Sequence, residues 1–131
     1  MLDDYRHCRY QDGGRGEVVS GVRVFDCYGL ARAVRHEQYD LSLLPAFAGI
    51  DPNDKPTASA SFAQVIADLA PGEPQDGALA LCWGGRLAIH CGVVVTVDGR
   101  PGVLEADEGV DVRWVPLRTF TRRFTRVEFY L

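Results

Sequence analysis

The stretch Phe25-Asp26-Cys27-Tyr28-Gly29-Leu30 places a cysteine directly after an aspartate, at the first position of a segment with helical periodicity. Counted from Cys27, apolar residues recur three, four and seven positions further along, which is the spacing of one helix face. Asp26 is a favourable N-cap residue, because its carboxylate can accept a backbone N–H of the first turn. We therefore predict a helix over residues 26–38. The start of a helix favours a thiolate, so Cys27 is a candidate nucleophile; the alternative is a buried cysteine that packs as a small hydrophobic residue.

The bulk composition is that of an ordinary globular protein. The chain has 131 residues, which fits one domain over residues 1–131, and 47% of them are hydrophobic and 24% charged. The formal net charge of −4 argues against a protein whose main task is to hold nucleic acid or anionic lipid. Some basic residues do cluster, and we interpret them as a solvated face or a local site for an acidic group: Arg113, Arg118, Arg122, Arg123 and Arg126.

The sequence also bears on targeting and on metals. No apolar run reaches the roughly 18 residues that a membrane span needs, so we expect no membrane insertion. The segment Met1-Leu2-Asp3-Asp4-Tyr5 lacks the basic and then apolar pattern of a signal peptide, so we expect synthesis in the cytoplasm without secretion by this route. The four cysteines show neither metal-ligand nor framework spacing. We predict no metal, no other cofactor and no disulfide scaffold.

Periodicity and turn residues predict the elements around the cysteine helix. Residues 2–10 can form a short helix, the glycines within 11–16 mark a turn, and 17–24 favour a short strand. Residues 39–56 contain three prolines and indicate a long loop, which leaves open whether this loop covers a groove. Residues 59–70 repeat an apolar helix face.

From residue 76 onward the apolar period changes to two. Turns are predicted at Gly84-Gly85 and 98–102, and an irregular or single-turn link over 116–123. The strands are predicted over residues 78–83, 87–97, 103–106, 110–115 and 126–130. Helices first and strands afterwards indicate an α+β fold, with N-terminal helices packed on a C-terminal antiparallel sheet.

His90 lies in the interior of the strand predicted over residues 87–97. Strict alternation puts the small residues Ala88 and Gly92 on its face, which leaves room beside the ring. A single histidine in such a place is most often a core residue. Together with a helix-capped Cys27, however, His90 is the expected base of a Cys–His dyad, whose members are neighbours in space and not in sequence.

A third polar group is expected to hold the imidazole by its other nitrogen, from a strand beside that of His90. If the turn at residues 98–102 closes a hairpin, Glu105 falls nearly opposite and can point to the same side. Asp107 shares the parity of Glu105 and is the alternative. Both can also be solvated carboxylates at the end of a strand.

Three motifs in this order resemble the NlpC-type cell-wall peptidases, which are papain-like cysteine enzymes: Asp26-Cys27-Tyr28-Gly29-Leu30, His90-Cys91-Gly92-Val93 and Val103-Leu104-Glu105-Ala106. Two further segments are similar to the family's Gly-Asp strand, with its first two residues exchanged, and to its aromatic residue followed by a Gly-Gly turn: Asp76-Gly77-Ala78-Leu79-Ala80-Leu81 and Arg9-Tyr10-Gln11-Asp12-Gly13-Gly14-Arg15. The resemblance covers residues 5–130 and is strongest to the version found in phage tail-assembly proteins and their prophage copies.

The resemblance implies an NlpC-type fold and hydrolysis of a peptide bond in peptidoglycan stem peptides, commonly between D-γ-glutamate and a diamino acid. By position, Cys27 would be the nucleophile, His90 the general base and Glu105 the third residue of the triad. Tyr10 matches the aromatic position near the active site, where its hydroxyl can help to stabilise the oxyanion. The third position is more often His, Asn or Gln than Glu.

Substrate binding is assigned by the same resemblance. Asp26 adjoins the nucleophile, and Tyr28 stands where the family has Trp or Ser, so it can form the wall of a subsite. Arg15, like Arg32 and Arg113, can hold the free carboxylates of the stem peptide; the alternative for each arginine is a surface charge.

Other functions also fit the sequence. The implied partners are the peptidoglycan stem peptide and phage tail proteins, and the implied location is a virion or tail that acts on the bacterial cell wall. A structural tail-tip or assembly component with little activity is a second hypothesis. A thiol acyltransferase or amidase on the same fold is a third, because the same dyad can pass acyl groups to amines or lipids.

Overall fold

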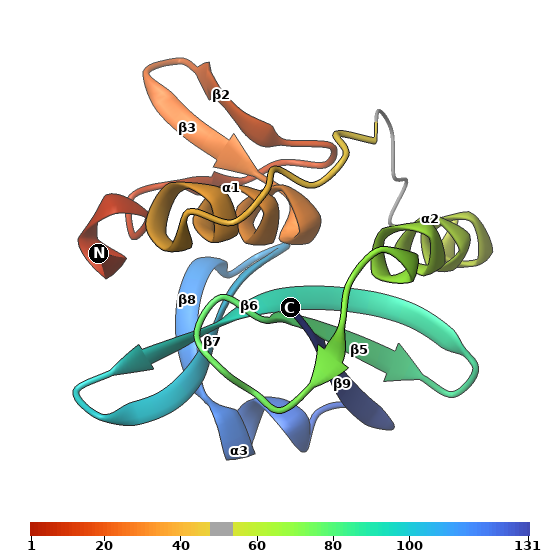
Figure 1. Ribbon diagram of the computed structural model, residues 1–131. Coiled ribbons are helices and arrows are strands. Elements are labelled where there is room, and N and C mark those ends of the chain that lie inside the picture. Colours follow the sequence, from red (N-terminus) through yellow and green to blue (C-terminus); the bar gives the residue numbers. More distant parts are fainter. Residues whose placement is uncertain (48–53) are drawn as a thin grey trace.

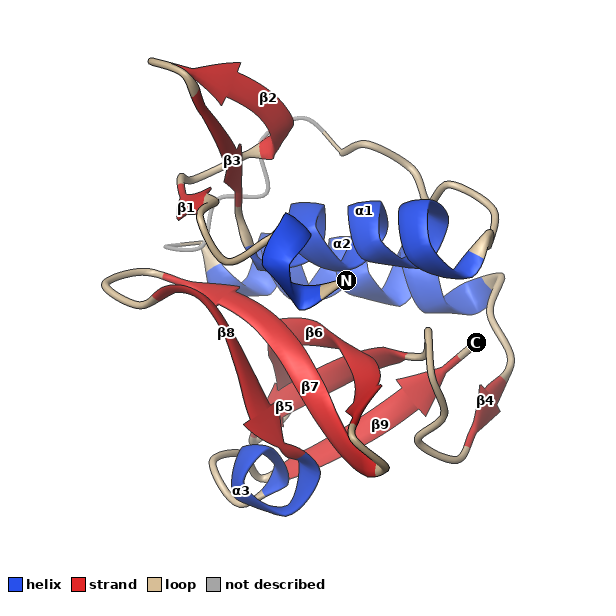
Figure 2. Ribbon diagram, turned by 90° about the vertical axis from the view of Figure 1, so that its left-hand side faces the viewer, coloured by secondary structure: helices blue, strands red, loops and turns tan. Residues whose placement is uncertain are grey.

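The helix that carries Cys27 lies between two sheets. The computed structural model describes residues 1–47 and 54–131. Helix α1 (Cys27–Tyr39) runs beside helix α2 (Lys55–Ala67), with a small sheet on one side and a large sheet on the other (Figures 1 and 2). The fold is thus a mixed α+β arrangement, as the sequence predicts.

The small sheet precedes α1. After a 3-10 turn (η1, Leu2–Asp4), it has the order β1-β3-β2, with β1 parallel to β3. Its strands are Arg9–Tyr10 (β1), Arg15–Val19 (β2) and Val22–Phe25 (β3). The predicted helix over residues 2–10 is therefore wrong beyond Asp4, and the predicted order of helices before strands is wrong at this end. A two-residue turn, Ser20-Gly21, folds the β-branched segment into a hairpin that a single predicted strand does not capture.

The large sheet has the order β4-β9-β5-β6-β7-β8, and each of its recorded strand pairs is antiparallel. Its strands are Pro71–Gly72 (β4), Leu79–Gly84 (β5), Leu87–Val97 (β6), Arg100–Asp107 (β7), Asp111–Pro116 (β8) and Arg126–Tyr130 (β9). Helix α3 (Leu117–Thr121) lies on the face of this sheet opposite to α1 (Figures 1 and 2).

Most predicted elements of the second half are confirmed within a few residues, and two coincide with β6 and β9. Strand β7 starts three residues early, because the turn is only Asp98-Gly99, both with positive φ. Helix α2 also starts early: Asp54 caps it through the N–H of Thr57, and Pro56 occupies its first turn, where proline is tolerated. Strand β4 is not predicted. Of the loop predicted over residues 39–56, residues 40–47 and 54 lie outside helices and strands, but residue 39 ends α1 and residues 55 and 56 begin α2, so the prediction is wrong at its two ends. Residues 48–53 lie outside the described residues.

A bulge interrupts β6 next to His90. Cys82 pairs with His90 but Trp83 pairs with Ala88, so Ile89 is the extra residue. The bulge shifts the alternation by one position, and Ala88 and Cys91 consequently belong to the same buried cluster. The predicted strict alternation, which put Ala88 on the face of His90, is wrong at this point.

Buried apolar side chains form a core on each face of the large sheet. The main core lies between the sheet and helices α1 and α2. A smaller one lies between the sheet and α3 and contains Ala80, Cys82, Val103, Val115 and Phe120. None of the helices in the described ranges is both long and apolar enough to cross a bilayer.

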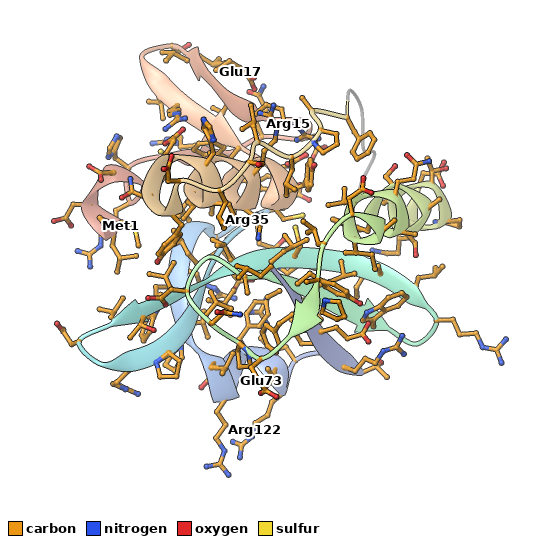
Figure 3. The ribbon with its side chains drawn as sticks, viewed as in Figure 1. Met1, Arg15, Glu17, Arg35, Glu73 and Arg122 are labelled. Atoms are coloured by element: carbon orange, nitrogen blue, oxygen red, sulfur yellow. The ribbon has the colours of Figure 1, made fainter. Side chains whose placement is uncertain are left out.

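Arg35 joins α1 to the large sheet. Its side chain is buried between the helix and the sheet (Figure 3) and donates to the carbonyl oxygens of Gly77 (2.8 Å), Tyr130 (3.3 Å) and Leu131 (3.0 Å). Burial lowers the pKa of this guanidinium. The carbonyl dipoles supply the stabilisation that a buried cation needs, so this contact fixes α1 against β9.

Candidate active site

Asp26 places Cys27 at the first position of α1. The backbone of Asp26 is extended (φ −90°, ψ −177°), and its Oδ1 accepts the N–H of Gly29 at 2.7 Å. Arg15 forms an ion pair with the same carboxylate, with Nη1 2.6 Å from Oδ1. Burial raises the pKa of Asp26, while Arg15 and the Gly29 N–H act in the opposite direction. The cap predicted from the sequence is confirmed.

A close backbone contact holds this first turn against the small sheet. Gly14 accepts the N–H of Asp26 at 3.1 Å. A Cβ atom on Gly29 would lie 2.0 Å from the carbonyl oxygen of Gly14, so only glycine fits at this position in α1. Gly29, two residues after the cysteine, therefore allows the turn at residues 11–14 to pack against the start of the helix.

The thiol of Cys27 is free; the residue as a whole is partly exposed, while burial acts on the thiol. Its pKa lies well below the ordinary value of 9.0, first through a hydrogen bond with the Cys91 side chain and then through a hydrogen bond with His90 and the positive charge of its ring; burial acts in the opposite direction. Burial and the contact with Cys27 raise the pKa of Cys91. The proton thus stays on Cys91, and the thiolate character lies on Cys27.

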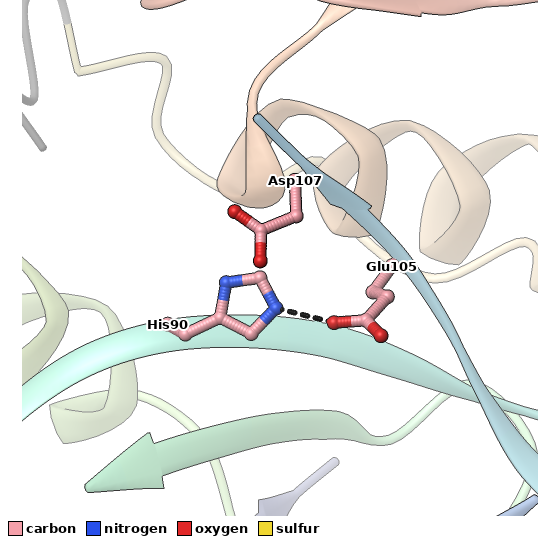
Figure 4. A group of neighbouring side chains, drawn as sticks. All are labelled: His90, Glu105 and Asp107. Atoms are coloured by element: carbon pink, nitrogen blue, oxygen red, sulfur yellow. Dashed lines mark hydrogen bonds and ion pairs between the residues drawn. The ribbon is translucent and has the colours of Figure 1, made fainter. Parts of the chain in front are cut away.

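His90 is held by Glu105. The Nε2 atom of His90 is 2.7 Å from Oε1 of Glu105 (Figure 4), and both side chains are buried. This bond leaves Nδ1 as the nitrogen for Cys27. Burial lowers the pKa of His90, but its hydrogen bonds with Cys27 and Glu105 outweigh burial and raise the pKa to about 10. The pair therefore favours a thiolate and an imidazolium.

Two arginines bind the carboxylate of Glu105. Arg123 is bidentate, with Nη1 2.5 Å from Oε2 and Nη2 3.0 Å from Oε1, and Arg113 donates through Nε to Oε2 at 3.0 Å. Burial raises the pKa of Glu105, but the hydrogen bonds from His90 and the arginines have the larger, opposite effect, so the pKa falls to about 2. Glu105 is therefore ionised at every pH at which a cysteine hydrolase works.

Gly92 allows strands β6 and β7 to approach each other closely. The recorded pairs of β6 and β7 run to Val93 and Leu104, and the same register puts Glu105 opposite Gly92. A Cβ on Gly92 would lie 2.4 Å from Cγ1 of Val103 and 2.9 Å from the carbonyl oxygen of Leu104. The absence of a side chain there brings Glu105 within reach of the histidine two residues away.

Asp107, the alternative third residue, has a different position. Its carboxylate lies above the His90 ring in the view of Figure 4, without a hydrogen bond drawn to the ring, and it accepts the backbone N–H of Glu108 at 2.9 Å. Donor atoms of His90, Glu105 and Asp107 lie within 4.8 Å of one another, the kind of group that can hold a metal ion. The two guanidinium charges on Glu105 oppose a cation there. Of the two carboxylates, Glu105 is the one that binds Nε2.

A small pocket opens beside the thiol. It is lined by Tyr10, Asp26, Cys27, Tyr28, Lys55, Ala58, Phe62 and Ile89. Tyr10 thus lies at the site, and burial raises its pKa, as does a hydrogen bond to Asp12. Tyr28 is buried and donates its hydroxyl to the carbonyl of Pro45 at 2.5 Å.

The arginines proposed for substrate binding are engaged within the protein. Arg15 pairs with Asp26 and donates to the carbonyls of Gly14 and Phe47, each at 2.9 Å; it lies near the β2–β3 hairpin (Figure 3). Arg32 donates through Nε to Leu44 at 2.7 Å. The substrate roles of Asp26, Tyr28 and Arg15 stay predictions.

Sequence reasoning did not identify the parts played by Cys91 and Arg123. Cys91 directly follows His90 and belongs to the main core with Val93 and Val95; its contact with Cys27 joins β6 to the start of α1, and no local pattern indicates such a contact. Arg123 belongs to the cluster of arginines noted in the sequence. The nearby Phe120 and Phe124 are a signal that could have identified it, since Phe124 stacks on the His90 ring with centroids 5.7 Å apart.

No protein-family model matches this chain, and no curated protein sequence matches it. The functional argument therefore depends on the geometry of the site.

Proposed function

We propose that the chain is a cysteine peptidase that hydrolyses a peptide bond of peptidoglycan stem peptides. The observation that carries this proposal is the arrangement of Cys27, His90 and Glu105. The thiol lies at a helix N-terminus, next to an imidazole whose far nitrogen is bound by a carboxylate at 2.7 Å. This is the geometry expected of an activated nucleophile, its base and the group that orients the base.

The proposed reaction has two steps. The Cys27 thiolate attacks the carbonyl carbon, and His90 gives its proton to the amine that leaves, which produces a thioester. Water then loses a proton to His90 and attacks the thioester, and the carboxylic acid product and the Cys27 thiolate are released, which restores the thiolate and the imidazolium. Glu105 keeps the imidazole in the orientation that both proton transfers need.

Backbone N–H groups of the first turn can stabilise the oxyanion. The cap residue Asp26 accepts the N–H of Gly29 through its side chain and that of Leu30 through its carbonyl. The cap does not use the N–H of Cys27, which adjoins the attacking sulfur. This group and the Tyr10 hydroxyl are the proposed donors to the oxyanion.

The substrate rests on the resemblance in the sequence. The bond we propose lies between D-γ-glutamate and a diamino acid, in a papain-like NlpC arrangement that serves a phage or prophage tail. Lys55 at the pocket adds a cation that suits a stem peptide, since these peptides carry free carboxylates.

The test is digestion of purified muropeptides with free stem peptides, followed by mass spectrometry of the products. We expect wild type to release a peptide that begins with the diamino acid and to leave a muropeptide whose stem ends in D-glutamate, and Cys27→Ala to produce neither. His36→Ala, on the exposed side of α1, is the matched control and should digest as wild type does. Hydrolysis that persists in Cys27→Ala would overturn the proposal. Products joined to an added amine would instead indicate an acyltransferase.

A further inference from the structure

We propose that Arg123 and Arg113 are positioning residues that hold Glu105 in the orientation in which it binds His90. The inference rests on the proposed Cys–His chemistry and concerns what keeps that chemistry ready. Both arginines lie outside the small pocket beside the thiol, and they act through Glu105.

The hydrogen bonds to Glu105 saturate its carboxylate. Oε1 accepts from His90 and Arg123, and Oε2 accepts from Arg113 and Arg123. A carboxylate offers about four lone-pair directions, so each is used. A glutamate side chain has three rotatable bonds, and in this arrangement none can turn without the loss of a charge-assisted hydrogen bond.

The two guanidinium charges also make a carboxylate usable at this buried position. Glu105 is 0% exposed, and a carboxylate with a single partner there would favour the protonated form. In a protonated Glu105 one acceptor position becomes a donor, so the side chain can no longer accept all four hydrogen bonds. The arginines thus allow a carboxylate to orient His90 from this buried position. A neutral Asn, Gln or His at the same position would need no positive charge beside it.

The two arginines differ in their expected contributions. Arg123 binds both oxygens, and its guanidinium carbon lies 5.2 Å from the ring centroid of Phe120 and 5.1 Å from that of Phe124. Arg113 binds one oxygen from β8, and 43% of its side chain is exposed. We therefore expect Arg123 to have the larger effect. Helix α3 and the residues after it, on the face opposite α1, then take part in organising the site (Figure 2).

Other titratable groups that influence this cluster are few in the described residues. Asp107 on β7 acts on Arg123, and Cys82 on β5 acts on Glu105 and Arg123. Burial raises the pKa of the Cys82 thiol, so it stays neutral over the range of the test. A fall in the alkylation rate at low pH that is caused by protonation of Glu105 should therefore disappear when Glu105 is replaced.

The experiment measures the alkylation rate of Cys27 by iodoacetamide from pH 4 to pH 9, with peptide mapping to separate Cys27 from the other thiols. The proteins are wild type, Arg123→Met, Arg113→Met, Glu105→Gln and the double variant of Arg123→Met with Glu105→Gln. Arg126→Met is the control, because Arg126 pairs with Glu128 and lies over Trp83, and it makes no recorded bond to Glu105. Arg123→Lys keeps the charge without the bidentate geometry.

We expect Arg123→Met to react about 10-fold more slowly at pH 5, with a new acid limb as the pKa of Glu105 returns towards 4.5. Arg113→Met should show a smaller loss, Arg123→Lys an intermediate one, and Arg126→Met none. In the Glu105→Gln background the acid limb should be absent, and the further change to Met should alter the rate less than about 2-fold.

A wild-type profile in Arg123→Met, or an equal loss with and without Glu105, would overturn the proposal. If Arg123→Met does not fold, Arg113→Met and Arg123→Lys decide by the same criterion. Failure of the proposed function is seen separately. If the alkylation profiles are as expected but the protein does not cleave muropeptides, the positioning role of the arginines stands and the proposed substrate is overturned. An ordinary thiol profile in wild type would overturn the dyad and the positioning role together.

Discussion

Two buried carboxylates support the two members of the dyad, and their pKa values shift in opposite directions. Asp26 has one arginine and one backbone N–H that lower its pKa, but burial and the negative charge of the neighbouring Cys27 outweigh them, so the pKa of Asp26 is raised. Glu105, beside His90, has a histidine and two arginines, and its pKa falls to about 2. The direction of the shift thus depends on the number and sign of the charged partners, and burial alone does not decide it.

The comparison extends to the halves around these acids. The cysteine half, which is Asp26 to Gly29 with Gly14 and Arg15, is built by contacts between residues at most 15 positions apart. The histidine half, which is His90, Glu105, Arg113 and Arg123, joins three strands and the segment after α3. One half is organised by backbone fit, and the other by charge. The following predictions test that distinction, from the largest expected effect to the smallest.

Gly29→Ala tests the backbone fit of the cysteine half. The new Cβ would lie 2.0 Å from the carbonyl oxygen of Gly14, and neither backbone can move freely. We expect a loss of about 4 kcal/mol in the free energy of unfolding, measured by urea denaturation. Gly72→Ala is the control, because its Cβ would meet nothing within 4 Å and its φ is not positive. Equal effects of the two substitutions would contradict the backbone fit.

Acidification tests the charge-based half. The folded pKa of Glu105 is about 2, below the ordinary 4.5, so its ionised form stabilises the protein above pH 4.5 and that contribution is lost as the pH falls from 4.5 towards 2. The difference corresponds to about 3 kcal/mol. The stability advantage of wild type over Glu105→Gln should therefore shrink between pH 7 and pH 3 in urea denaturation. An advantage that is the same at both pH values would show that Glu105 has no depressed pKa.

Gly92→Ala tests whether the histidine half also needs a backbone fit. The Cβ would meet a methyl group of Val103 at 2.4 Å, and that side chain can turn more easily than a backbone. We expect a loss of about 2 kcal/mol in the free energy of unfolding, and a Cys27 thiol pKa that moves up as Glu105 is displaced. Thermal denaturation and alkylation against pH measure the two effects. A stable variant with an unchanged thiol would show that the strands can separate without harm.

Cys91→Ala tests a link between the halves. The hydrogen bond with the Cys91 side chain is the largest cause of the low pKa of Cys27. Its loss should raise the thiol pKa towards the ordinary value of 9.0, as measured by alkylation against pH. His90 still lowers the pKa in this variant, so it should remain below the ordinary 9.0. The control is Cys8→Ala, because the sulfur of Cys8 bonds the carbonyl oxygen of Asp4 instead of Cys27. A larger shift in the control would contradict the assignment.

The same division explains what the sequence could predict. The cap at Asp26 and the helix after it follow from local rules, and the structure confirms them. The bond between His90 and Glu105 could be predicted because a hairpin turn fixes the register of β6 and β7. Both predictions depend on residues joined by a helix turn or a hairpin.

The remainder depends on distant contacts. The small N-terminal sheet needs the parallel pairing of β1 with β3, which neither strand's own pattern indicates. The bulge at Ile89 changes the face of Ala88 through pairing with β5. Arg123 reaches Glu105 from 18 positions away, and a cluster of arginines in sequence does not show which member turns inward.

Arg35 has a consequence for the order in which the chain can mature. Two of its three carbonyl partners, Tyr130 and Leu131, lie 95 and 96 positions further along the chain. During synthesis, the helix that carries Cys27 therefore leaves the ribosome long before the partners that its buried cation requires. The final docking of α1 must wait until β9 has been made, which delays assembly of the thiol, the imidazole and the carboxylate until synthesis reaches that strand.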